Sequence, residues 1–421
     1  MQSDSTTPMT TPEGLESYHP LDPVGAFDLY PKLARFRREC PVFRTLRPDY
    51  PPVTFFTRYA DIVTILRDPD AFQSMGTNVT LEDYEQIPVE ERYHIELNGA
   101  EHAEVRRLLL SAVSPVAIKR VIPLIEALGK QIVDGFLASG QADMVADWAA
   151  LMPGMATAFV MGFPMEDGPK IHQWVHAQLD DDALKQAEAD KKQLRGNEMA
   201  PHFGDYLVEQ IAMRRDGRIT AEDGLTQILR YQPRRGYPFT DRELVLHVHS
   251  LLVAANETTT SFMANALRRI LQTPGLYRQL RTDRSLIEPF LREVARIDPP
   301  LVLLTRCCTR PTTVAGENLQ PGEVVILSLA SANHAETVWG VDADEFRPDR
   351  FNAIVDKDVM TFGIGVHFCP GSHLAKLEAT IALNAMFDQI EDMRLGPDAR
   401  LEKVWYYLID RPKRIDVEFA V

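Results

Sequence analysis

The chain has 421 residues, of which 45% are hydrophobic and 25% charged, and its formal net charge at pH 7 is -15. So acidic a balance argues against nucleic acid and against an anionic membrane surface as partners. No apolar run reaches the roughly 18 residues that a membrane-spanning helix needs. The four cysteines (Cys40, Cys307, Cys308 and Cys369) show no disulfide spacing, which indicates a reducing, cytoplasmic compartment.

The N-terminal stretch, residues 1–23, is rich in Pro, Thr and Ser and has no basic region followed by an apolar core. It is therefore not a secretory signal, and we predict that it is disordered. No internal repeat or low-complexity linker interrupts the remainder. Residues 24–421 are accordingly predicted to form one large, mostly helical domain.

The first regular elements are short. Residues 27–36 predict an amphipathic helix, residues 53–56 a strand, and residues 61–66 a helix that ends at an Asp-Pro pair. Residues 75–99 are polar, with scattered Gly, Asn and Pro, and predict an irregular segment. An irregular segment this long inside a compact protein is usually functional or mobile.

The next stretch contains two basic residues on one face of a predicted helix. His102 and Arg106 are four residues apart, so their side chains lie on the same side and could bind a pair of carboxylates. Considered alone, an exposed helix face is the more frequent explanation. Residues 114–162 have continuous helical spacing, and the charged stretch 170–200 predicts solvated helix faces and a loop.

A long helix is predicted in the middle of the chain. Thr240 and Glu243 form a capping box, and the pattern stays helical to Leu271, before Thr-Pro-Gly. About 30 residues span roughly 45 Å, enough to cross the whole domain. Near its middle, Glu257 precedes three threonines that are poor helix formers, of which Thr258 is the first. An acid beside threonines in an apolar helix marks a candidate site.

Three features follow this helix. Glu293 and Arg296 are three residues apart, which by composition alone predicts a surface ion pair. The apolar run 301–304 is followed by Arg306, an unusual position for a charge. Residues 312–330 alternate as strands around a Gln-Pro-Gly turn.

The last feature is a ten-residue stretch, 362–371, with the sequence FGIGVHFCPG. Its glycines allow a tight turn and a close backbone approach. Cys369 enters a helix-forming run, where backbone N–H groups and the helix dipole stabilise a thiolate. The stretch therefore predicts a soft metal ligand, and the alternative is a buried structural cysteine.

This stretch resembles the haem-binding loop of the cytochrome P450 family, Phe-x-x-Gly-x-(Arg/His)-x-Cys-x-Gly, and every fixed position matches. Further motifs of the family occur in order at residues 102–106, 254–258, 293–296 and 346–351. The resemblance extends from about residue 28 to 411. It implies a mainly α fold with a small β region, a single domain that holds haem b (iron protoporphyrin IX) between the long helix and the cysteine loop.

The resemblance also implies individual roles. Cys369 would be the axial metal ligand, bound as thiolate. Glu257 would relay protons, and the Thr258 hydroxyl would hold dioxygen or a water. The other implied haem contacts are His102, Arg106, Arg306 and His367 at the propionates, with Phe362, Gly363, Gly371, Ala254 and Ala255 along the ring. Ala255 departs from the glycine that is usual in the family and narrows the oxygen groove.

Two further sets of residues follow from the resemblance. The substrate pocket would be lined by Val253, Ala254, Val302, Leu303 and Leu304, with segments 75–99 and 170–200 as its lids. The mostly apolar lining predicts a small lipophilic substrate such as a terpenoid, fatty acid, steroid or aromatic. Glu293, Arg296 and Arg350 would form a buried charged cluster that fixes the cysteine loop.

The implied activity is insertion of one oxygen atom from O2 into a C–H bond, by a monomer. Because the chain carries no flavin or iron–sulfur motif, electrons would come from a separate ferredoxin and its reductase. They would dock around Cys369 near Arg107 and Lys376. The alternatives are a haem-thiolate protein that only binds or senses a ligand, a peroxide-driven oxygenase, and a non-haem helical protein. Glu257 and Thr258 favour the dioxygen enzyme, because a sensor needs no proton relay.

Overall fold

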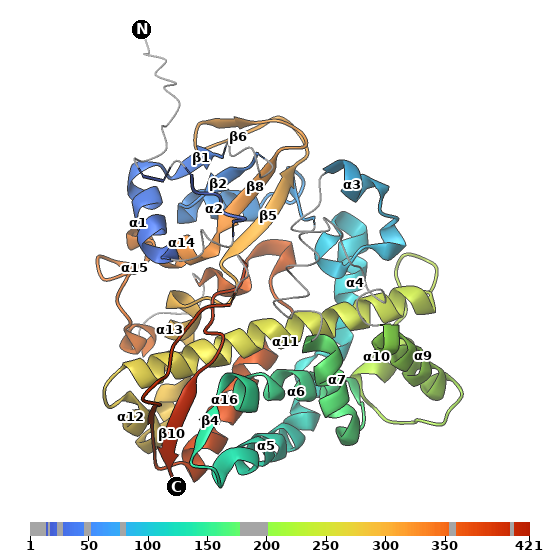
Figure 1. Cartoon of the computed structure of the whole chain (residues 1–421). Helices are drawn as coiled ribbons and strands as arrows, with labels where there is room; N and C mark the ends of the chain where they lie inside the picture. The colour runs from blue at the N-terminus through green and yellow to red at the C-terminus, as the bar shows by residue number, and fades with distance from the viewer. Residues whose placement is uncertain are drawn as a thin grey trace.

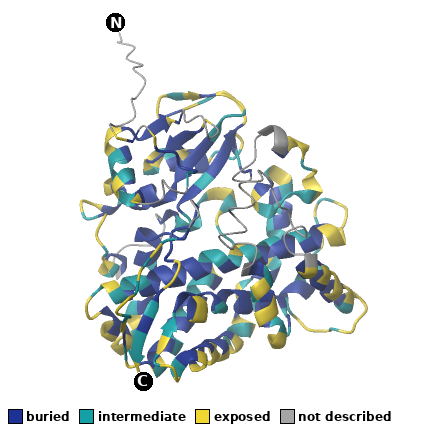
Figure 2. Cartoon of the chain, viewed as in Figure 1, coloured by how far each residue is buried: buried dark blue, intermediate teal, exposed yellow. Residues whose placement is uncertain are grey.

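The computed structural model describes residues 14–15, 17–22, 28–45, 52–75, 81–176, 201–352, 359–404 and 408–421. Most described elements are helices, and the strands form small sheets, which confirms the predicted fold class (Figure 1). Buried residues follow the strands and the long central helix, and exposed residues lie on the outer faces of the peripheral helices (Figure 2).

The central helix, α11 (Asp241–Gln272), crosses the molecule with the largest sheet on one side (Figure 1). On its other side lie α5 (Pro115–Leu137), α6 (Leu151–Met161) and α16 (Ser372–Gln389). Its predicted start is confirmed: the Thr240 hydroxyl accepts from the Glu243 N–H at 3.2 Å, and the Glu243 carboxylate accepts from the Thr240 N–H at 2.7 Å. It ends one residue beyond the predicted limit. The capping box therefore fixes where this axis of the fold begins.

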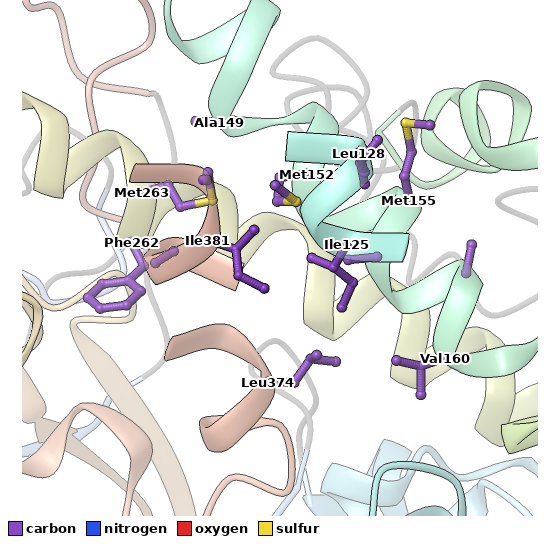
Figure 3. Packing of buried hydrophobic residues seen from close by; sticks show 14 of the residues in the cluster. Ile125, Leu128, Ala149, Met152, Met155, Val160, Phe262, Met263, Leu374 and Ile381 are labelled. Atoms are coloured by element: carbon purple, nitrogen blue, oxygen red, sulfur yellow. The ribbon is translucent and has the colours of Figure 1, made fainter. Parts of the chain in front are cut away.

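The main core is formed by α11 and the helices packed around it. These are α4 (Gly99–Ala112), α5, α6 and α16. In Figure 3, Met263 from α11, Ile381 from α16 and Met152 from α6 converge with side chains of α5. This packing holds α16, the helix that follows Cys369, against α11.

The predicted continuous helical pattern over 114–162 is interrupted. Between α5 and α6 lie β4 (Gln141–Asp143) and a π-helical turn (Val145–Ala149), and Gly140 has a φ of 66°. β4 pairs with β10 (Asp416–Ala420) near the C-terminus, which also pairs with β9 (Asp392–Leu395). A strand partner so distant in sequence leaves no trace in the local pattern.

The largest sheet has five strands in the order β1 (Val42–Arg44), β2 (Thr54–Phe56), β8 (Val324–Ser328), β5 (Leu303–Cys308) and β3 (Phe72–Gln73). β2 and β8 run parallel with Phe55 opposite Ile326, and the other pairs are antiparallel. The predicted hairpin is also present, as β6 (Thr312–Val314) and β7 (Glu317–Leu319). The predicted strands at 53–56 and within 312–330 are thus confirmed.

Part of the expected disordered lead is packed. Tyr18 is 7% exposed, and its ring centroid lies 5.1 Å from that of Phe36 on α1 (Leu29–Glu39). Leu15 and Leu21 are buried in the same cluster. The prediction of disorder is wrong for these residues, because their apolar side chains cover α1 and the sheet. The other parts of 1–23 lie outside the described residues.

The segment expected to be irregular, 75–99, is largely ordered. It contains α3 (Leu81–Gln86) and two short 3-10 turns, η2 (Val89–Glu91) and η3 (His94–Glu96). Asn98 Nδ2 donates to the Ser74 carbonyl at 2.8 Å and to the Tyr84 hydroxyl at 3.1 Å. This segment is held by hydrogen bonds from polar side chains. Its order therefore produces no apolar periodicity in the sequence. Residues 84–98 are called the cover unit below; residues 76–80 lie outside the description.

The other described helices and 3-10 turns are α2 (Tyr59–Leu66), η5 (Met165–Asp167), α7 (Gly168–His176), α9 (Pro201–Arg215), α10 (Gly224–Arg230), α12 (Leu276–Thr282), η7 (Arg284–Leu286), α13 (Ile287–Ile297), α14 (Leu329–Asn333), α15 (Glu336–Trp339), η8 (Pro348–Asn352), η10 (Met360–Phe362) and η11 (Gly365–His367). Most of the charged stretch 170–200 lies outside the described residues. Among those described, no single helix is long and apolar enough to cross a membrane, although the bent pair α4–α5 passes by combined length and composition.

Candidate functional site

The cysteine loop depends on two left-handed glycines. Gly363 has a φ of 67° and Gly365 a φ of 73°, and a Cβ on Gly365 would lie 2.7 Å from the Leu66 carbonyl oxygen. The Cys369 N–H then donates to the Phe362 carbonyl at 2.9 Å, which closes the loop. Gly371 differs from the expectation, because its φ is -89° and a Cβ there would make only ordinary contact with the Cys369 sulfur.

The sulfur of Cys369 faces the start of α16. Burial raises the pKa of its thiol, while the backbone N–H groups of Gly371 and Ser372 and the charge of Arg106 act to lower that pKa. A thiolate here receives hydrogen bonds from the helix start, as the sequence predicted, but it also needs a positive partner to offset its burial. A metal ion is such a partner.

Four predicted basic residues meet beside this loop. His102 and Arg106 come from α4, Arg306 from β5 and His367 from η11, and the His102 and His367 ring centroids are 4.0 Å apart. His102 Nε2 and Arg106 Nη1 are buried and have no hydrogen-bond partner within the part of the chain that the structure describes. Arg306 is 5% exposed, and its Nη1 donates to the carbonyl of its neighbour Thr305.

The electrostatics of this cluster are unbalanced. Burial, followed by the charges of Arg106 and Arg306, lowers the pKa of His102 to about 4. Burial also lowers the pKa of Arg306 to about 10. Within the described parts of the chain, neither arginine forms an ion pair with a carboxylate. Unpartnered buried donors of this kind fit the two carboxylates of a haem, whose charge would restore the balance.

Sequence reasoning missed one member of the cluster. His94, in η3, stacks on His102 with ring centroids 4.8 Å apart and planes 16° from parallel. Its Nε2 is buried without a partner. No sequence signal marked it, because it lies in the polar segment that lacks helical periodicity.

The middle of α11 carries the predicted acid and threonine. Ala254 is exposed and Ala255 half-buried. The Thr258 hydroxyl donates to the Ala254 carbonyl at 2.7 Å, as expected for a threonine within a helix, and α11 continues through it. The two alanines leave space beside the helix, and their expected haem contact stays a prediction.

The Glu257 carboxylate has a partner that the sequence did not indicate. Its Oε1 accepts from Arg411 Nε at 2.7 Å and from the Ser261 hydroxyl at 3.3 Å. Arg411 lies in the C-terminal segment, 154 residues away. Both side chains are mostly buried, with exposures of 8% for Arg411 and 15% for Glu257. The predicted proton carrier is thus held in an ion pair.

The predicted pocket lining divides into two groups. Val253 is half-buried, Ala254 is exposed and Leu304 is half-buried, so each has surface available to a ligand. Val302 and Leu303 are only 2% exposed and are packed in the cluster of α1 and the sheet. For these two the expectation of a ligand-facing side chain is wrong, because they fill the core beneath the sheet.

The predicted charged cluster is present and buried. Arg296 donates to both carboxylate oxygens of Glu293 at 2.8 and 2.7 Å, with both side chains 0% exposed, and Arg350 Nε lies 3.8 Å from Glu293 Oε1. Arg296 also donates to the Asn333 carbonyl, and Asn333 Oδ1 accepts from the Met360 N–H at 2.7 Å. The cluster therefore connects α13 to the start of the cysteine loop.

The chain is similar to known proteins over most of its length. The family model described as Cytochrome P450 matches residues 29–391. The monooxygenase PikC of Streptomyces venezuelae is 28% identical over 94% of this chain and 93% of its own length. The cyclomarin C epoxidase CymV of Salinispora arenicola is 29% identical over 87% of this chain and 89% of its own. The open structure of the cytochrome P450 Eryk from S. erythraea superposes with a TM-score of 0.80 and 26% identity, covering 94% of this chain and 96% of that one.

Proposed function

We propose a function from the premise that the chain belongs to the cytochrome P450 family and is a monooxygenase. The proposed reaction is the insertion of one oxygen atom of O2 into a C–H bond of a small lipophilic substrate. The observation that carries the proposal is the basic cluster beside the Cys369 loop, in which His102 Nε2 and Arg106 Nη1 are buried without a hydrogen-bond partner among the described residues. We further propose that the enzyme is a cytoplasmic monomer, with residues 24–421 as a single domain and haem b as its cofactor.

The residues around the cysteine suit this cofactor. Cys369 would hold the iron, with the N–H groups of Gly371 and Ser372 stabilising charge on its sulfur. His102, Arg106, Arg306 and His367 would neutralise the propionates. When bound, the haem supplies a thiolate-ligated iron that favours O–O cleavage. Phe362, Gly363, Gly371, Ala254 and Ala255 are proposed to line it.

Protons would reach the site along α11. The Thr258 oxygen, whose hydrogen is directed to the Ala254 carbonyl, can accept a hydrogen bond from a water. Glu257, one residue earlier, would carry protons inward from the side where Arg411 binds it. The ion pair with Arg411 holds this carboxylate in place.

The substrate would lie beside the same helix. Val253, Ala254 and Leu304 offer apolar surface, which favours a lipophilic molecule and excludes water from the reacting centre. PikC and CymV, both named as oxidising enzymes, resemble this chain over most of its length. A screen for compounds that shift the haem spectrum from low to high spin would identify the substrate.

Electrons are proposed to come from a ferredoxin and its reductase, docking on the cysteine side. Val366 and Phe368 are 46% and 43% exposed there. Arg107 pairs with Glu104, and Lys376 lies with its Nζ 5.2 Å from the Phe362 ring centroid. Lys376→Glu should slow reduction, and unchanged reduction kinetics in this variant would contradict the docking site.

The central test is the difference spectrum of the reduced protein with carbon monoxide. We expect the band of thiolate-ligated haem, its loss in Cys369→Ser, and its retention in the matched variant Cys308→Ser. Absence of the band in the unmodified protein would overturn the proposal. Substrate-dependent NADH consumption with a ferredoxin system separates the enzyme from a ligand sensor. Product formation from hydrogen peroxide alone would favour the peroxide-driven alternative.

A further inference from the structure

Three histidine rings form a column beside the cysteine loop. His367, His102 and His94 come from η11, α4 and η3, with successive ring centroids 4.0 and 4.8 Å apart. The first two belong to the motifs already described. His94 is the outermost ring and the only one of the three in the cover unit.

The environment of His94 is basic, and its side chain is half-buried. Burial, followed by the charges of His102, His247 and Arg106, lowers its pKa to about 3. None of the groups that shift this pKa is acidic. The neighbouring Glu96 carboxylate instead accepts from the Tyr93 N–H at 2.9 Å. His94 is therefore a neutral imidazole, and its buried Nε2 has no hydrogen-bond partner among the described residues, which costs free energy unless a ligand supplies one.

The cover unit that carries His94 is held together by its own polar side chains. The Tyr84 hydroxyl donates to the Glu96 carbonyl at 2.5 Å, and Asn98 Nδ2 donates to the same carbonyl at 3.1 Å. Arg92 donates to the carbonyls of Ile87 and Tyr84 at 3.0 and 3.1 Å. These hydrogen bonds connect the parts of the cover unit to one another. A displacement of His94 would therefore move residues 84–98 together.

We propose that His94 donates a hydrogen bond from Nε2 to a haem carboxylate and so anchors the cover unit over the cofactor. His94 is then a positioning residue: the carboxylate completes its hydrogen bonding, and the ring stack with His102 sets its direction. This inference rests on the proposed haem site but is separate from turnover. The proposed hydrogen bond of His94 would link the cover unit to the cofactor. This link is additional to the expected position of the segment above the substrate.

The test compares haem-loaded variants. His94→Phe keeps an aromatic ring to stack on His102 and removes the donor, whereas His94→Gln keeps a donor without the ring. The matched control is His249→Phe. His249 lies on α11, is 2% exposed, and has its ring centroid 5.2 Å from that of Phe203. Haem loss is measured by transfer to excess apomyoglobin, and hydrogen exchange is followed in peptides covering residues 84–98.

We expect His94→Phe to lose haem roughly tenfold faster, as the loss of one hydrogen bond to a charged group predicts. Exchange in residues 84–98 should increase, while α16 and the control variant stay unchanged. His94→Gln should recover most of the wild-type rate. The proposal is overturned by a wild-type rate in His94→Phe, or by equal acceleration in both variants, which would show that a retained hydrogen-bond donor does not slow haem loss. A missing thiolate band in the unmodified protein would instead overturn the function.

Discussion

Arg411 Nε lies 2.7 Å from Oε1 of Glu257, so the acid expected to handle protons on α11 is bound to the C-terminal segment. Two further bonds of this pair are short-range: Ser261 donates to Glu257, and Arg411 donates to the carbonyl of Pro412. The ion pair joins two parts of the chain at the place where protons are proposed to enter.

Removing the arginine should therefore uncouple the reaction. In Arg411→Gln the Glu257 carboxylate loses its main partner, and we expect less product per NADH consumed. Loss of one partner of a mostly buried pair should also lower the free energy of unfolding by about 3 kcal/mol. The measurement is product yield against NADH oxidation. Arg411→Lys, which keeps the charge, should retain more coupling, and unchanged coupling in Arg411→Gln would contradict the role.

Two glycines of the cysteine loop should respond differently to alanine. Gly365→Ala places a Cβ 2.7 Å from the Leu66 carbonyl at a φ of 73°, so the loop must shift. The left-handed conformation alone costs about 1–2 kcal/mol for a residue with a Cβ. We expect a lower haem-to-protein ratio and a lower melting temperature. Gly371→Ala, with its ordinary φ, should retain wild-type haem content, and equal loss in both would refute this difference.

The buried pair on α13 should be far more important for stability than its exposed neighbour. Glu293→Gln leaves Arg296 buried without its counter-charge and should lower the free energy of unfolding by about 3–5 kcal/mol. Glu288→Gln, on the same helix, removes an ion pair with Arg292 in which Glu288 is 73% exposed. It should change stability by less than about 1 kcal/mol. Urea unfolding of both variants makes the comparison, and similar midpoints would argue against a structural role for the cluster.

The buried acid Glu378 on α16 predicts a pH dependence of stability. Burial raises the pKa of Glu378 well above its ordinary value, so the folded state retains a proton that the unfolded chain releases. Its stabilising effect is complete below the unfolded pKa and is lost as pH rises towards the folded pKa, at up to about 1.4 kcal/mol per pH unit. Wild type should therefore lose more stability than Glu378→Gln between pH 6 and 8. Equal changes in the two urea midpoints would contradict this.

Local chemistry explains how much of the fold the sequence predicts. Thr240 and Glu243 define the start of α11 because a capping box involves only neighbouring groups. The positions of Gly363, Gly365 and Cys369 follow from the turn and the helix start that this short stretch must form. The Glu293–Arg296 pair was recognisable from its spacing, although only the family resemblance indicated that it is buried.

Tertiary structure decided the features that depend on distant partners. The parallel pairing of β2 with β8, the strand that interrupts the helical pattern after Gly140, and the burial of Val302 and Leu303 follow from contacts across the fold. Arg411 and His94 joined the site in the same way. Thus the sequence alone determined the cysteine loop and the start of the long helix, because the hydrogen bonds that form them join neighbouring residues. Only the folded chain determined which charges meet Glu257 and His102, because those pairings link segments without a shared period or motif.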